Sequence, residues 1–97
     1  MVDMRKEILG LFKALSEEVR QDILELLTEH EMNVTEICEQ FKITQPTVSH
    51  HLQVLKNCNI VDSRKEGKMV YYFVKREVVN DMFGNIIEKF DIEISEE

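Results

Sequence analysis

Residues 44–56 carry polar side chains that could form hydrogen bonds with DNA bases. Val48, Leu52 and Leu55 recur at helical spacing, so this segment is expected to form a helix with one apolar face. The opposite face is short, polar and mostly uncharged, a composition that suits hydrogen bonding to base edges in a major groove. It consists of Pro46, Ser49, His50 and Gln53, with Gln45, Thr47 and Lys56 at its margins. A solvated helix surface can have the same composition, so this helix alone leaves both interpretations open.

Another short helix is expected directly before this segment. Asn33 and Glu36 have the spacing of a capping box, in which each side chain accepts from the backbone N–H of the other residue. The following residues have one apolar helical face, made by Val34, Ile37, Cys38 and Phe41. Residues 42–43 then form a tight link to Thr44, whose hydroxyl is suited to cap the next helix. Two helices joined in this way are a candidate helix-turn-helix.

The remaining elements complete the pattern of a winged helix-turn-helix. Helical spacing predicts three further helices, at residues 3–15, from a capping Ser16 to about His30, and at residues 76–90. Two β-rich runs, at 60–65 and 68–74, are separated by Glu66-Gly67, a hairpin signal because Gly adopts positive φ readily. The expected fold is mainly α with a small β-hairpin, in the order α-α-α-α-β-β-α. We expect one domain over residues 1–97, with the wing at about 60–74.

Charge is distributed unevenly along the chain. The 97 residues have a net charge of −7, yet residues 42–76 contain seven Lys and Arg against two Asp and Glu, a balance of +5. Residues 1–41 and 77–97 each have a balance of −6. Screening limits exposed charges to a reach of about 8–10 Å, so phosphate binding depends on the local charge. The basic block includes the hairpin tip, with Arg64, Lys65 and Lys68, although a purely structural hairpin with an incidentally basic tip is the alternative.

Other features narrow the functional class. No apolar run approaches the roughly 20 residues of a membrane span, and the first residues lack the apolar core of a signal peptide. Two cysteines without a dense cysteine framework favour a reducing cytoplasm. The sequence contains no glycine-rich phosphate loop, nucleophile motif or metal-binding motif, so we do not expect an enzyme.

From about Leu11 to Phe90 the chain resembles the ArsR/SmtB family of small bacterial and archaeal repressors. Residues 43–52, Ile-Thr-Gln-Pro-Thr-Val-Ser-His-His-Leu, closely resemble the family's recognition helix. Residues 12–20 resemble its opening stretch. The run Asn59-Ile60-Val61 resembles the wing motif, together with Arg64, Gly67 and Tyr72.

This resemblance implies that double-stranded DNA is a partner. The implied contacts are to bases or neighbouring phosphates from Gln45, Thr47, Ser49 and His50, to phosphate from Thr44, and to the DNA backbone from Arg64, Lys65 and Lys68. Gln53 shares the outward face and is included as a candidate. His51 matches the family's histidine but lies at the edge of the apolar arc. For His51 we favour a half-buried, hydrogen-bonded side chain over a base-reading one.

The resemblance also implies a homodimer in which the first and last helices pack against their symmetry mates. The candidate interface residues are Met4, Ile8, Leu11, Phe83, Ile86, Ile87 and Phe90. Large exposed apolar patches usually mark partners. The alternative is that part of this set belongs to the core of a single chain.

The usual metal sites of the family are not matched. The residues at the corresponding positions are Asn33 and Thr35 for the thiolate site, and Arg76, Val78 and Lys89 for the site on the last helix. We therefore expect no metal and no cofactor, and the inducing signal, a small molecule or a redox change, stays open. Cys38 and Cys58 are expected to be small buried hydrophobes, with a redox role or a disulfide as the alternatives.

The preferred function is a sequence-specific DNA-binding regulator, a repressor by family default, acting on an imperfect palindrome. Two alternatives remain. A winged helix that binds proteins would predict an apolar or acidic recognition face, and a winged-helix regulator of another family would form a different dimer.

Overall fold

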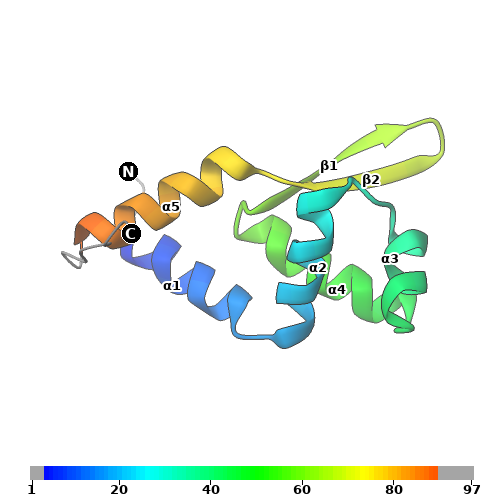
Figure 1. The fold of residues 1–97 in the computed structure, drawn as a ribbon, viewed down its shortest axis with the longest axis horizontal. Helices are drawn as coiled ribbons and strands as arrows, with labels where there is room; N and C mark the ends of the chain where they lie inside the picture. Colours follow the sequence, from blue (N-terminus) through cyan, green and yellow to red (C-terminus); the bar gives the residue numbers. More distant parts are fainter. Residues whose placement is uncertain (1–3, 90–97) are drawn as a thin grey trace, which may run out of the picture.

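The computed structural model describes residues 4–89, and these form five helices and one β-hairpin in the predicted order (Figure 1). The helices are α1 (Met4–Leu15), α2 (Glu18–Glu29), α3 (Val34–Phe41), α4 (Gln45–Asn57) and α5 (Arg76–Lys89), and the strands are β1 (Val61–Glu66) and β2 (Met69–Val74). In Figure 1, α1 and α5 occupy one end of the molecule, while α3 and the hairpin lie at the other. This arrangement confirms the mainly α winged helix-turn-helix.

The hydrophobic core lies beneath α4. Val48, Leu52 and Leu55 are each 0% exposed, as the predicted apolar stripe requires. The same cluster contains residues from α1, α2, α3 and β1, among them Leu11, Ile23, Leu27, Ile37 and Val61. Full burial of a leucine stabilises the fold by about 1.5–3 kcal/mol. The stripe therefore fixes which face of α4 points outward.

The start of α3 has the predicted capping box. The Asn33 side chain accepts from the Glu36 backbone N–H at 2.9 Å, and the Glu36 carboxylate accepts from the Asn33 backbone N–H at 3.1 Å. At the other end Lys42 adopts a left-handed conformation, with φ 55°, and its N–H bonds to the carbonyl of Cys38. This turn makes the link between α3 and α4 short.

The two other predicted caps were wrong in detail. Thr44 stands at the N-cap of α4 but makes no capping bond, because its hydroxyl pairs with the Thr47 hydroxyl at 2.9 Å. Ser16 does not cap α2. Its hydroxyl donates to the Lys13 carbonyl at 2.7 Å, which places it with the end of α1, and Glu17 is the N-cap residue.

The hairpin is antiparallel, with Val61 opposite Val74 and Glu66 opposite Met69. Its two-residue turn is therefore Gly67-Lys68, one residue later than the predicted Glu66-Gly67. Gly67 has φ 61°, and glycine at the first turn position matches the type II′ hairpin turn.

A third segment joins the edge of this hairpin. Met32 forms an isolated antiparallel bridge with Tyr72, with backbone N–H···O=C distances of 3.2 Å and 2.8 Å. The segment between α2 and α3 is thereby attached to β2. The sequence pattern did not indicate this contact, because a single bridge has no periodicity.

The predicted dimer set divides between core and surface. Ile8, Leu11 and Ile86 are only 7%, 1% and 7% exposed and belong to the core of the chain itself, so they are corrected to core residues. Phe83 is 43% exposed and Ile87 is half-buried. The side chain of Met4 and the whole of Phe90 lie outside the part of the chain that the structure describes. Two other apolar residues of α1, Leu9 and Phe12, are exposed and were not in the predicted set.

Candidate nucleic-acid interface

The outward face of α4 presents the predicted polar residues to solvent. All six are exposed, namely Thr44, Gln45, Thr47, Ser49, His50 and Gln53. The Gln53 amide donates to the Asn57 side-chain oxygen at 2.8 Å, one turn further along. Ser49 and His50 have no side-chain hydrogen bond to any residue within 4–89, so both are free to bind a ligand at the centre of this face.

His51 points the other way and is 8% exposed. Its Nδ1 accepts from Arg20 Nε of α2 at 3.2 Å, which supports the buried, hydrogen-bonded interpretation. Since Nδ1 is the acceptor, the neutral ring carries its proton on Nε2. Burial, followed by the nearby charges of Arg20 and His50, lowers the pKa of His51 below its ordinary 6.5, while Glu17 acts in the opposite sense.

Arg20 joins three elements and was missed as a functional candidate. Besides its bond to His51, its Nη1 donates to the carbonyls of Lys13 and Ala14, both at 3.4 Å, at the end of α1. The guanidinium therefore links α1 and α2 to the inner face of the recognition helix. In the sequence, the only signal for Arg20 was its place at the end of residues 12–20, which resemble the opening stretch of the family.

The wing lies next to the end of α4. Lys56 Nζ of α4 donates to Ser63 Oγ of β1 at 3.0 Å. Because side chains alternate along a strand, Lys65 shares this face with Ser63, whereas Arg64 projects from the opposite face. Lys65 and Lys68 are exposed, and neither has a side-chain bond among the described residues.

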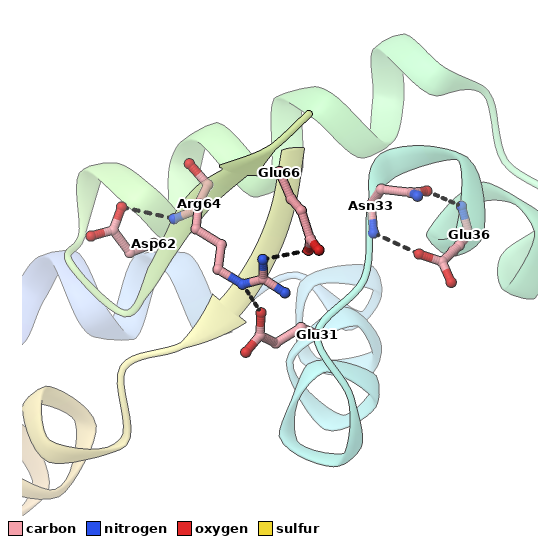
Figure 2. Close-up of polar contacts among 7 residues, drawn as sticks. Glu31, Asn33, Glu36, Asp62, Arg64 and Glu66 are labelled. Carbon is pink, nitrogen blue, oxygen red and sulfur yellow. Dashed lines mark hydrogen bonds and ion pairs between the residues drawn. The ribbon is translucent and has the colours of Figure 1, made fainter. Parts of the chain in front are cut away.

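Arg64 is held by two carboxylates, as Figure 2 shows. Its Nε lies 2.6 Å from Glu31, in the segment between α2 and α3, and its Nη1 lies 2.7 Å from Glu66 at the end of β1. The guanidinium also lies 5.1 Å from the ring centroid of Tyr71, its cross-strand partner. The hydrogen bonds that Arg64 donates to Glu66 and Glu31 raise the pKa of its guanidinium, which therefore stays charged.

Two further basic residues of the positive block bind within the chain. Lys75 Nζ donates to the Asn59 side-chain oxygen at 2.7 Å, and the Arg76 guanidinium donates to the Thr28 carbonyl. The structure thus separates the cations of residues 42–76 into those with partners in the chain and those, such as Lys65 and Lys68, that project into solvent.

Cys38 and Cys58 form no disulfide with each other, and both are free thiols. Cys58 is half-buried and its Sγ lies 3.5 Å from the Gly10 carbonyl of α1. Burial raises the pKa of Cys58, which opposes formation of the reactive thiolate. Cys38 is half-buried on α3 against the core. Within residues 4–89 no three His, Cys, Asp or Glu side chains are grouped so as to hold a metal ion.

No helix of the described region combines the length and the apolar character needed to span a membrane.

Known proteins with similar sequences and folds are transcriptional regulators. Residues 17–63 match the model described as bacterial regulatory protein, arsR family. The transcriptional repressor SdpR of Bacillus subtilis is 35% identical over 85 residues, covering 84% of this chain and 94% of that protein.

Solved structures share the fold. An ArsR-like transcriptional regulator from Rhodococcus sp. RHA1 superimposes with a TM-score of 0.84 at 24% identity, over 93% of this chain and 84% of that one. The homodimeric winged helix-turn-helix DNA-binding domain Mb0332 of Mycobacterium bovis has a TM-score of 0.73 at 30% identity, over 93% and 83% of the two chains.

Proposed function

Given that the chain belongs to the ArsR family of bacterial regulatory proteins and is a DNA-binding transcriptional regulator rather than an enzyme, we propose that it represses transcription as a homodimer on an imperfect palindrome. The observation that carries this proposal is the outward face of α4. It presents Ser49 and His50, both exposed and without a side-chain hydrogen bond to residues 4–89, on a helix whose other face is fixed in the core.

The polar groups on this face suit base recognition. A serine hydroxyl both donates and accepts, so it can bind several base edges, and a neutral imidazole offers one donor and one acceptor. Neither residue provides the bidentate fork with which arginine binds guanine. His50 therefore favours an operator preference unlike that of a regulator that carries arginine at the same position of its recognition helix.

The homodimer is supported by exposed apolar side chains on the outer helices. Leu9 and Phe12 of α1 are 53% and 50% exposed, and Phe83 of α5 is 43% exposed. Leu9 and Phe12 are three residues apart and so share one side of α1, and contiguous apolar exposure usually marks a partner surface. A two-fold dimer would place its two recognition helices about one DNA turn, roughly 34 Å, apart, which requires a palindromic operator.

The inducing signal is proposed to be something other than a metal ion at the usual family positions. Asn33 and Thr35 replace the thiolates of one site, and Asn33 is already used in the capping box of α3. The residues aligned with the other site, Arg76, Val78 and Lys89, offer no histidine or carboxylate to a metal.

Fluorescence anisotropy with the DNA upstream of the protein's own gene tests this function. We expect tight binding to that duplex and much weaker binding to a scrambled duplex of the same length and composition. Sedimentation in the same buffer should give a dimer. Equal affinity for both duplexes would contradict sequence-specific recognition, and no affinity for either would favour a protein-binding winged helix.

The same assay, repeated with zinc, arsenite and a thiol oxidant, tests the signal. We expect neither zinc nor arsenite to release the DNA at stoichiometric concentration. Release by zinc or arsenite would contradict the proposed metal independence. Release by the oxidant alone would assign a redox role, which Cys38→Ser and Cys58→Ser would then locate.

A further inference from the structure

We propose that Glu31 and Arg64 position the wing, and that the phosphate contacts of the wing come from Lys65 and Lys68 rather than from Arg64. This inference rests on the DNA-binding function proposed above. It changes the role that family resemblance implies for Arg64 and gives a role to Glu31, an acidic residue that resemblance did not single out.

The first observation is that the Arg64 guanidinium already has three partners. Glu31 and Glu66 accept from its Nε and Nη1 at 2.6 Å and 2.7 Å (Figure 2). The ring centroid of Tyr71 lies 5.1 Å from the guanidinium carbon. Charge-assisted bonds are stronger than bonds between neutral groups, but here the side chains of Arg64, Glu31 and Glu66 are 46%, 45% and 66% exposed, so solvent screens the ion pairs. A phosphate that approached Arg64 would meet two carboxylates beside a single cation, and so would face a local charge of −1.

The second observation is that the two faces of the wing have different neighbours. On one face Lys56 of α4 binds Ser63, and strand alternation places Lys65 on that same side, toward the recognition helix. On the other face Arg64 extends across Tyr71 of β2 to Glu31. Lys65 therefore lies on the face nearer the DNA-reading helix, whereas Arg64 lies on the face nearer the start of α3.

The third observation is the segment that carries Glu31. The backbone of its neighbour Met32 forms two hydrogen bonds with the backbone of Tyr72 in β2, and the next residue, Asn33, caps α3. The ion pair therefore ties β1 to a backbone segment that is fixed at both the sheet and the helix-turn-helix. An ion pair to a rigid anchor orders the wing before DNA arrives, and such preorganisation lowers the entropy loss on binding.

The proposal predicts the direction of an unusual effect. Removal of an acidic charge near a DNA-binding surface normally increases affinity for DNA. Glu31→Gln is instead expected to weaken binding about three- to fivefold for operator and scrambled DNA alike, a size typical of one exposed ion-pair network. The matched control is Glu29→Gln, which removes the same charge from an exposed residue at the end of α2 and should leave affinity unchanged or slightly higher.

The salt dependence separates positioning from direct phosphate binding. The salt slope is defined here as the magnitude of the slope with which log K falls as log salt rises. A lost phosphate contact lowers this magnitude by about one. Arg64→Ala and Glu31→Gln should keep the wild-type slope, whereas Lys65→Ala should lower it by about one. Arg64→Lys keeps the positive charge but loses the planar fork that reaches both carboxylates, so it should bind as weakly as Arg64→Ala.

The decisive experiment measures anisotropy titrations at four salt concentrations for wild type, the single variants Glu31→Gln, Glu29→Gln, Arg64→Ala and Arg64→Lys, and the double variant Glu31→Gln/Arg64→Lys. Thermal unfolding verifies the fold of each. The expected result is that the double variant binds no more weakly than either single variant, since each breaks the same contact. The inference is overturned if Glu31→Gln binds more tightly than Glu29→Gln, if Arg64→Ala lowers the slope by about one, or if Arg64→Lys binds like wild type. Failure of the wild-type protein to bind any duplex would overturn the proposed function as well.

Discussion

The recognition helix and the wing are both rich in polar side chains, yet they differ in how many of those side chains are already bonded. On α4, Ser49 and His50 are exposed and have no side-chain hydrogen bond within the described residues, and His50 contacts only the His51 ring among the aromatic rings there, at 5.8 Å between centroids. The stripe on the other face of α4 is fully buried. On the wing, Arg64 is bonded to two carboxylates and stacked on a tyrosine. If the wing is positioned as proposed above, exposure and charge alone do not identify a DNA contact, because an exposed cation can already be bonded within its own chain.

The largest expected effect concerns the buried side of α4. Leu52 is 0% exposed, so Leu52→Ala should destabilise the protein by about 2–5 kcal/mol through lost burial and a cavity. Urea denaturation followed by circular dichroism measures this change. The matched wing variant is Met69→Ala, 41% exposed, for which a change below about 1 kcal/mol is expected. Equal losses for the two variants would show that the helix is no better anchored than the wing.

The next largest effect is on base discrimination. Ser49→Ala or His50→Ala should reduce the preference for operator over scrambled DNA by about 1–3 kcal/mol, because base contacts carry sequence specificity. Competition anisotropy gives this ratio directly. Asn80→Ala, an exposed polar change on α5, is the control and should leave the ratio intact. An unchanged ratio in both α4 variants would remove the outward face of α4 from the DNA interface.

A smaller effect is expected for the free lysine of the wing. Lys65→Ala should weaken operator and scrambled DNA to about the same extent and lower the salt slope by about one, because phosphate contacts are independent of sequence. The ratio between the two duplexes should stay at the wild-type value. A loss confined to the operator would mean that the wing, like α4, reads bases.

The smallest expected effect is the pH dependence of His51. Its pKa is lowered in the folded protein, so the unfolded chain takes up the proton first as the solution is acidified. The stabilisation from the neutral ring is complete above about pH 6.5 and is lost as the pH falls below that value and through the folded pKa. Thermal unfolding of wild type between pH 8 and pH 5 should therefore show a fall in melting temperature that His51→Gln reduces. An identical acid-side fall in the variant would assign the effect to other groups.

The order of elements was predictable because it depends on local patterns. The stripe of Val48, Leu52 and Leu55 fixed the orientation of α4, and the Asn33–Glu36 spacing fixed the start of α3 to the residue. Each of these signals lies within a few positions of the chain. The outward residues of α4 could therefore be named correctly as exposed before their surroundings were known.

The contacts that distinguish free from engaged side chains could not be predicted in this way. Glu31 and Arg64 are 33 positions apart, and Arg20 and His51 are 31 apart. Periodicity gives the face on which such a residue lies, but only the packing of several elements brings the two members of a pair together. The same limit explains why the predicted dimer-interface residues included core residues. Helical spacing could not separate the buried Ile8 and Ile86 from the exposed Phe83.

The bridge between Met32 and Tyr72 has a consequence for how this chain can vary in length. Residues 30–33 join α2 to α3, hold the edge of β2 and begin the capping box, so an inserted residue there would displace the wing and the helix-turn-helix together. The hairpin tip has no such constraint, since a side-chain atom added at Gly67 would meet nothing within 4 Å. The fold should therefore tolerate insertions at the tip, provided that positive φ is preserved, although an insertion there would lie beside Lys65 and Lys68 and should weaken DNA binding. Insertions in the short segment before α3 should instead disrupt the fold.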